Sequence, residues 1–214
     1  MRCFSWILAV SDKMLSMVRK VHIAMEVLWL ATIFALPLIF FPNIFTTFEL
    51  AKVTVFKGAA TLLFLLWILK YFLSGVSPAF AWKPRKFLWL SLAAFLGFYL
   101  LATFASVAPA LSFFGWYPRF QGLLTFFNYA AFGLVIFFEL RTARQRERLM
   151  LVVMLSFLAV CAIALLQKFL PGFLSFWNDA EFNGRIYGTM ANPNYLATYV
   201  VMILPLAVVN IFGA

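Results

Sequence analysis

Two arginines are the residues of this sequence that most directly suggest chemistry. Arg119 lies in the segment APALSFFGWYPRFQ (108–121), and Arg185 lies in the segment PGFLSFWNDAEFNGRIYGTMANPN (171–194). A guanidinium is planar and always charged, and it binds a phosphate through two parallel hydrogen bonds. Both arginines are therefore candidate phosphate- or pyrophosphate-binding groups. The alternative is that each anchors its segment at a membrane interface, beside aromatic neighbours. These neighbours are Trp116, Tyr117, Trp177 and Tyr187.

Two acids in the second segment, Asp179 and Glu181, form another candidate site, because paired carboxylates carry out much sugar chemistry. They stand beside Asn178 and the pair Asn183-Gly184, where acids commonly serve as turn and capping residues. We interpret them as turn and capping residues.

The tripeptide Asn192-Pro193-Asn194 predicts the start of a helix, with Asn192 as N-cap and Pro193 at the first helical position. A helix start also presents free N–H groups to an anion, so these residues and the nearby Gly188 are candidate site-forming residues.

Other kinds of site are not indicated. The single histidine, His22, stands four residues before Glu26, and no group of His, Cys, Asp or Glu has metal-ligand spacing. The sequence contains no glycine-rich phosphate loop and no nucleophile elbow. We therefore expect no metal and no cofactor, and we assign no catalytic residue. The ionisable groups near the apolar segments all fall close to segment ends, which disfavours proton- or ion-coupled transport.

The elements that must position these residues are membrane helices. Of the 214 residues, 65% are hydrophobic and only 11% are charged, against about 25% charged in soluble domains. Apolar runs of about 20 residues span a bilayer as helices. The runs predict an all-α, polytopic membrane protein with six transmembrane helices. Their ranges are 24–41, 53–70, 87–107, 122–139, 149–168 and 195–212. Lys57 falls inside the second run, where we expect its stem to lift the ammonium to the interface. We expect Pro37 and Pro205 to kink their helices.

The net charge of +10 is distributed unevenly between the two sides of the predicted helices. Eleven basic residues lie in the N-terminal segment and in the second and fourth loops, whereas the other loops hold only Lys52, Arg119 and Arg185. The positive-inside rule then places the N-terminus in the cytoplasm. Residues 1–23 become a basic cytoplasmic tail, and residues 24–214 form the membrane domain. The loops at about 42–52, 108–121 and 171–194 face outward. The basic run RTARQRER (141–148) is a topology determinant that meets anionic lipid, and nothing indicates nucleic-acid binding.

Three segments, in order, resemble one bacterial family. The segment RIYGTMANPNYLA (185–197) is similar to the R-x-x-G-x-x-x-NPN-x-x-A pattern of the O-antigen ligase and polymerase superfamily. FELAK (48–52) and RFQGLLT (119–125) are similar to upstream pieces of the same proteins.

The resemblance implies a glycosyl-transfer enzyme in the bacterial cytoplasmic (inner) membrane. Such an enzyme moves a glycan from an undecaprenyl-pyrophosphate carrier to a lipid, protein or glycan acceptor at the outer face, as in lipopolysaccharide biosynthesis. Arg185 and Arg119 would bind the pyrophosphate, without a metal.

Two departures from the family qualify this expectation. Family members have about twice as many spans, and they carry a histidine in a large outward loop, whereas the only histidine here is His22. We therefore expect this chain to be an N-terminal part that is inactive alone. The alternatives are a polytopic transporter or lipid flippase, and a non-catalytic membrane scaffold.

Overall fold

Backbone hydrogen bonds in lipid must be satisfied within each segment, and the apolar segments accordingly form helices. The computed structural model describes residues 2–40, 49–75, 86–116, 119–170, 184–190 and 192–212, with side chains described from residue 13 to residue 210. The described residues are mostly helical, and they include no strand. The helices are α1 (Arg2–Ala35), α2 (Glu49–Ser74), α3 (Lys86–Phe104), α4 (Pro109–Phe114), α5 (Leu123–Glu139), α6 (Ala143–Phe169) and α7 (Pro193–Phe212).

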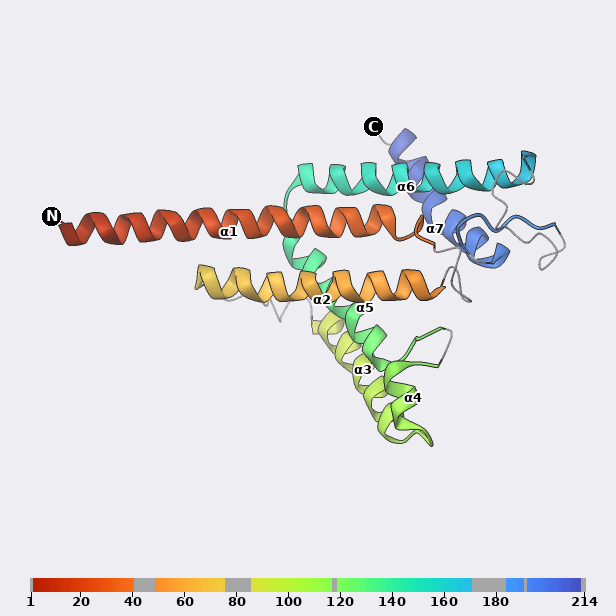
Figure 1. Cartoon of the computed structure of the whole chain (residues 1–214), viewed down its shortest axis with the longest axis horizontal. Coiled ribbons are helices and arrows are strands. Elements are labelled where there is room, and N and C mark those ends of the chain that lie inside the picture. The colour runs from red at the N-terminus through yellow and green to blue at the C-terminus, as the bar shows by residue number, and fades with distance from the viewer. Residues whose placement is uncertain are drawn as a thin grey trace. The chain divides into compact units, whose positions relative to one another are not determined.

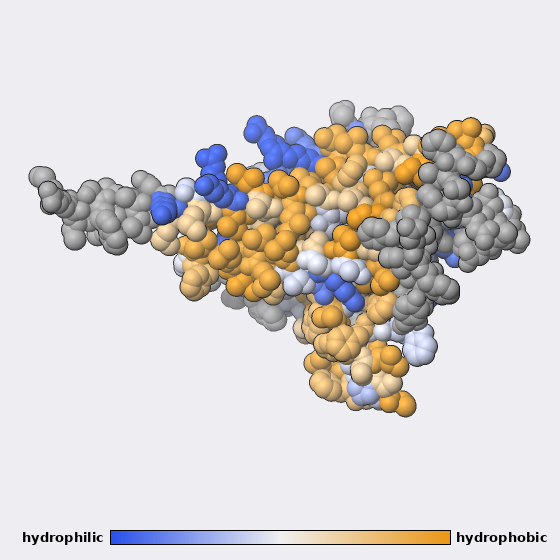
Figure 2. Space-filling model, viewed as in Figure 1, coloured by the Kyte–Doolittle hydropathy of each residue, from blue (hydrophilic) through white to orange (hydrophobic). Residues whose placement is uncertain are grey.

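Four of these helices, α2, α3, α6 and α7, are long and apolar enough to cross a membrane. The shortest qualifying stretch has 18 residues, or about 27 Å of helix, close to the thickness of a bilayer core. The helix α5 is also apolar but shorter, with 17 residues. Large apolar side chains lie exposed along these helices, and Figure 2 shows the resulting hydrophobic surface. A soluble monomer rarely exposes so much apolar surface, so the chain is a multi-pass membrane protein.

The first predicted span, 24–41, differs most from the observed helix. Residues 2–35 form one continuous helix, so the predicted basic tail 1–23 is helical over the described residues and runs directly into the apolar part. The helix ends at Ala35, two residues before Pro37, so the predicted kink is instead a helix end. The residue before a proline avoids the helical conformation, which accounts for this end. Because α1 is not among the four spanning candidates, the predicted count of six is not established.

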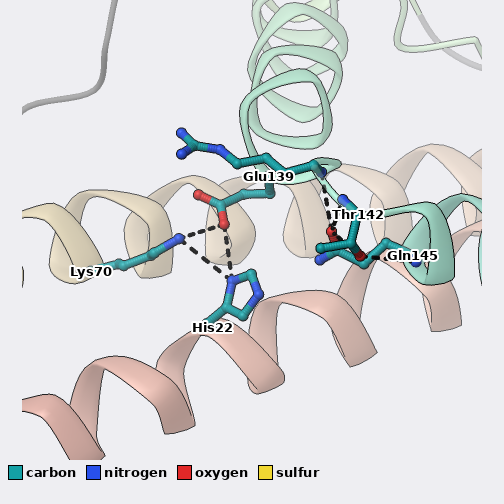
Figure 3. A network of polar contacts seen from close by, with 6 residues as sticks. His22, Lys70, Glu139, Thr142 and Gln145 are labelled. Carbon is teal, nitrogen blue, oxygen red and sulfur yellow. Dashed lines mark hydrogen bonds and ion pairs between the residues drawn. The ribbon is translucent and has the colours of Figure 1, made fainter.

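The helix α6 corresponds to the fifth predicted span, 149–168, but it begins at Ala143, six residues earlier. The earlier start is explained by a capping box at Thr142. Thr142 accepts a hydrogen bond from the Gln145 backbone N–H at 3.2 Å, and the Gln145 side chain accepts one from the Thr142 N–H at 3.1 Å. Both interactions are visible in Figure 3. Thr-x-x-Gln is the sequence signature of such a start, so the basic residues 144–148 lie in the first turns of the helix.

The chain divides into two compact units. Unit 1 comprises residues 1–29 and 57–140, and unit 2 comprises residues 30–56 and 141–214. In unit 1, α3 and α5 run side by side with α4 against both (Figure 1). Phe138 of α5 stacks on Trp89 of α3 and on Trp67 of α2, with ring centroids 5.8 and 5.7 Å apart. In unit 2, α6 packs against α7, and the Ser156 hydroxyl lies 3.4 Å from that of Tyr199.

Candidate functional site

Arg185 belongs to a short non-helical segment of unit 2, residues 184–190, which we call the Arg185 segment. Gln167, in the last turns of α6, holds this segment through its side-chain oxygen. Gln167 Oε1 accepts hydrogen bonds from the backbone N–H groups of Tyr187, at 3.1 Å, and Gly188, at 2.7 Å. Tyr187 and Gln167 are both buried, whereas Arg185 is exposed. The backbone is therefore fixed while the guanidinium stays accessible.

Gly188 is required by the backbone geometry at its position. Its φ is +52°, in the left-handed region that favours glycine, and it is buried against α6. A Cβ atom there would lie 3.5 Å from Cβ of Ala164. The glycine of the predicted R-x-x-G pattern thus lets the chain turn between Arg185 and α7.

Lys52 holds the other side of the Arg185 segment. Its Nζ donates hydrogen bonds to the carbonyl oxygens of Thr189, at 2.6 Å, and Pro37, at 3.1 Å, and lies 3.6 Å from Sδ of Met190. The Thr189 hydroxyl also donates to the Pro37 oxygen, at 2.7 Å. Lys52, from the segment FELAK, is therefore in direct contact with the Arg185 segment. Nothing in the sequence indicates this contact.

An open cleft of about 600 Å³ lies beside the Arg185 segment. Two cations line it, Arg185 and Lys168, the latter from the last turn of α6. The remaining lining is mostly apolar, and four of its residues come from α7: Leu196, Ala197, Val200 and Val201. The cleft therefore combines a positively charged part with a hydrophobic wall. In the sequence, Lys168 ends the fifth predicted span, and nothing there predicts that it lines the same cleft as Arg185.

The predicted helix start at Asn192 is confirmed. The Asn192 side chain accepts a hydrogen bond from the backbone N–H of Asn194 at 2.8 Å, and α7 begins at Pro193, which also lines the cleft. The backbone oxygen of Asn192 accepts from the N–H of Tyr195. Proline has no N–H, so the first donors of this helix are occupied by the cap. Side chains of Lys168 and Arg185, rather than backbone N–H groups, are left to bind an anion in the cleft.

Arg119 belongs to a loop of unit 1 between α4 and α5, residues 115–122, which we call the Arg119 loop. Residues 117 and 118 lie outside the described residues. Two glycines close the base of this loop. A Cβ on Gly115, whose φ is +92°, would lie 2.3 Å from the carbonyl carbon of Phe120, and one on Gly122 would lie 2.3 Å from the nitrogen of Gly115. Only residues without a side chain permit so close a backbone approach.

The carbonyl of Phe120, next to Arg119, accepts two hydrogen bonds from side chains. Lys57 Nζ of α2 donates at 3.1 Å, and the Thr125 hydroxyl of α5 donates at 2.7 Å. Phe120 has a φ of +50°, a conformation that costs free energy for a residue with a side chain and that these contacts help to hold. Lys57 was predicted only to reach the membrane interface, but it fixes the Arg119 loop.

The two predicted phosphate-binding arginines lie in different units, Arg119 in unit 1 and Arg185 in unit 2. Of the predicted set, Arg185 and Pro193 line the same cleft, whereas Gly188 of the same segment is buried against Ala164. The predicted acid pair, Asp179 and Glu181, lies outside the described residues. Among the residues that are described, no three His, Cys, Asp or Glu side chains are grouped so as to hold a metal ion.

A charged cluster in unit 1 was not predicted from the sequence (Figure 3). Glu139 ends α5 and is 3% exposed. Its Oε2 lies 2.5 Å from Nζ of Lys70 in α2 and 3.0 Å from Nδ1 of His22 in α1. The second oxygen, Oε1, has no hydrogen-bond partner among the described residues. The cluster ties three helices together around one buried carboxylate.

The predicted topology contained the signal for this cluster. His22 precedes the first predicted span, Lys70 ends the second and Glu139 ends the fourth. In a chain that alternates direction, these positions all fall on the same side of the membrane. Opposite charges on one side of the membrane are therefore available to pair.

Comparison of the chain with protein-family models, with curated proteins and with solved structures finds no match.

Proposed function

We propose that this protein is part of a membrane glycosyl-transfer enzyme that uses a polyprenyl-pyrophosphate-linked glycan. The cleft beside Arg185 is the observation that carries the proposal. Its two cations suit a phosphate or pyrophosphate, and its apolar wall on α7 suits the hydrocarbon chain of a lipid. A ligand that has both parts is a phosphorylated or pyrophosphorylated lipid.

The role of the cations follows from the charge that develops during transfer. When the bond between the sugar and the pyrophosphate breaks, the leaving oxygen gains negative charge, and fixed cations lower the free energy of that state. Arg185 is suited to this because Gln167 holds the backbone of its segment at Tyr187 and Gly188, while Arg185 itself is exposed. We assign no catalytic base to a residue of this chain.

The proposed location follows from the distribution of charge. The basic residues of α1 and of the first turns of α6 would face the bacterial cytoplasm, and the Arg185 and Arg119 segments would face outward. The acceptor, whether a lipid, a protein or a growing glycan, would then be met at the outer face of the inner membrane.

Ligand binding to the purified full chain in lipid nanodiscs tests the proposal. We expect undecaprenyl pyrophosphate to bind, and the uncharged polyprenol to bind much more weakly. Arg185→Ala and Lys168→Ala should each weaken pyrophosphate-lipid binding about tenfold, the effect of losing one hydrogen bond to a charged group. Arg144→Ala is the matched control, because Arg144 is an exposed arginine of α6 that does not line the cleft.

Two results would contradict the proposal. One is equal binding of undecaprenyl pyrophosphate and polyprenol, which would leave the cations without a role. The other is equal loss of binding in Arg144→Ala and Arg185→Ala, which would indicate general electrostatic attraction rather than a site.

A further inference from the structure

We infer that Lys52 and Lys57 of α2 are positioning residues, each of which fixes the loop that carries one candidate phosphate-binding arginine. Lys52 holds the Arg185 segment in unit 2, and Lys57 holds the Arg119 loop in unit 1. What the arginines bind rests on the proposed function, but the fixing of the loops does not.

Neither lysine is explained by the stability of its own helix. Lys52 is the fourth residue of α2, where the positive end of the helix dipole disfavours a cation, and Lys57 is the ninth residue, within the apolar part of the helix. A lysine within an apolar membrane helix also costs about 2.5–3.5 kcal/mol at the bilayer centre and less toward the end. Among the described residues, no carboxylate pairs with either ammonium. Their partners are instead main-chain carbonyl oxygens from other segments of the chain.

The Lys52 contacts act on the backbone directly before α7. The ammonium joins the carbonyl of Thr189 to that of Pro37, while Gln167 holds the N–H groups of Tyr187 and Gly188. The Arg185 segment is thus held through its N–H groups from one side and through a carbonyl from the other. Without Lys52, the Thr189 end of the segment would keep the hydrogen bond from the Thr189 hydroxyl to Pro37 and the turn bond from the Met190 N–H to the Tyr187 carbonyl.

The Lys57 contact acts at the residue after Arg119. Phe120 occupies a left-handed conformation, and its carbonyl is oriented by Lys57 and Thr125 together. Removing the ammonium takes away one of the two side-chain donors, Lys57 and Thr125, that orient this carbonyl. A mobile loop loses backbone freedom when its arginine binds an anion, and this loss costs free energy. Because the lysine already fixes the loop before binding, that cost is smaller and binding is favoured.

Amide hydrogen exchange of the full chain in nanodiscs tests the inference. Lys52→Met and Lys57→Met keep the side-chain length and remove the charge, and each is the control for the other because both change the same helix. Lys52→Met should speed exchange of the Tyr187, Gly188 and Met190 amides about tenfold and leave the Phe120 amide unchanged. Lys57→Met should do the reverse. Lys52→Arg, which retains a donor, should restore slow exchange in the Arg185 segment.

The two possible failures are distinguishable. Unchanged exchange in both loops, or an equal rise in both loops for either variant, would overturn the positioning role. If exchange rises only in the expected loop but wild type binds no undecaprenyl pyrophosphate, the positioning role stands and the proposed function fails. If wild type does bind this lipid, Lys52→Met should weaken binding about tenfold, and unchanged binding would overturn the role of the lysine in presenting Arg185.

Discussion

Gly188 connects the conformation of one residue to the presentation of Arg185. It combines a φ of +52° with burial against Ala164, so a side chain at this position meets both backbone strain and a neighbouring helix. The amide of Gly188 also makes the shorter of the two hydrogen bonds to Gln167. A change in its conformation would therefore release the Arg185 segment from α6.

We expect Gly188→Ala to lower the free energy of unfolding by about 1–2 kcal/mol, the cost of a left-handed conformation for a residue with a Cβ. The measurement is reversible unfolding of the purified protein in mixed detergent micelles. Gly133→Ala is the control, because Gly133 lies within α5 and a Cβ there meets nothing within 4 Å. Equal effects of the two substitutions would show that Gly188 has no special backbone role.

At the level of helices, the cluster around Glu139 joins α1, α2 and α5 of unit 1. A carboxylate at the C-terminal end of a helix is disfavoured by the helix dipole, and burial makes its charge costlier still. Lys70 and His22 offset these costs at distances of 2.5 and 3.0 Å. The three helices are consequently coupled, because moving α1 or α2 away from α5 removes a partner from the Glu139 carboxylate.

Removing one partner of this pair should be worse than removing both. We expect Lys70→Met to lower the free energy of unfolding by about 3 kcal/mol, and Lys70→Met with Glu139→Met to recover most of that loss, because an apolar pair replaces a buried ion pair. Unfolding titrations of the single and double variants give the comparison, with the exposed Lys86→Met as control. A double variant as unstable as the single one would contradict this account.

For the whole molecule, the distribution of basic residues predicts which ends of the helices face the cytoplasm. The positive-inside rule gives one answer for every loop at once, since successive spans alternate direction. Trp116 lies in the Arg119 loop and is 70% exposed, and Arg144 is exposed in the first turn of α6. The two positions are predicted to lie on opposite sides of the membrane.

Labelling of single cysteines in bacterial cells tests this orientation. In a background with Cys3→Ser and Cys161→Ala, we expect Trp116→Cys to react with a membrane-impermeant maleimide in spheroplasts. Arg144→Cys should react only after the cells are opened, because Arg144 belongs to the basic run 141–148, which is predicted to stay inside. If Arg144→Cys reacts in spheroplasts and Trp116→Cys reacts only in opened cells, the predicted topology is wrong. The cleft beside Arg185 would then face the cytoplasm.

The sequence alone determined that this is a helical membrane protein, and it located the helix start at Asn192. These features depend on local properties: in lipid each segment must satisfy its own backbone hydrogen bonds, and a helix cap involves residues close in sequence. Only the tertiary structure decided that Lys168 shares a cleft with Arg185, that Lys52 and Lys57 hold two loops, and that His22, Lys70 and Glu139 meet. The lysines bind main-chain carbonyls, which every residue possesses, so no residue type in the sequence marks Thr189 or Phe120 as the acceptor.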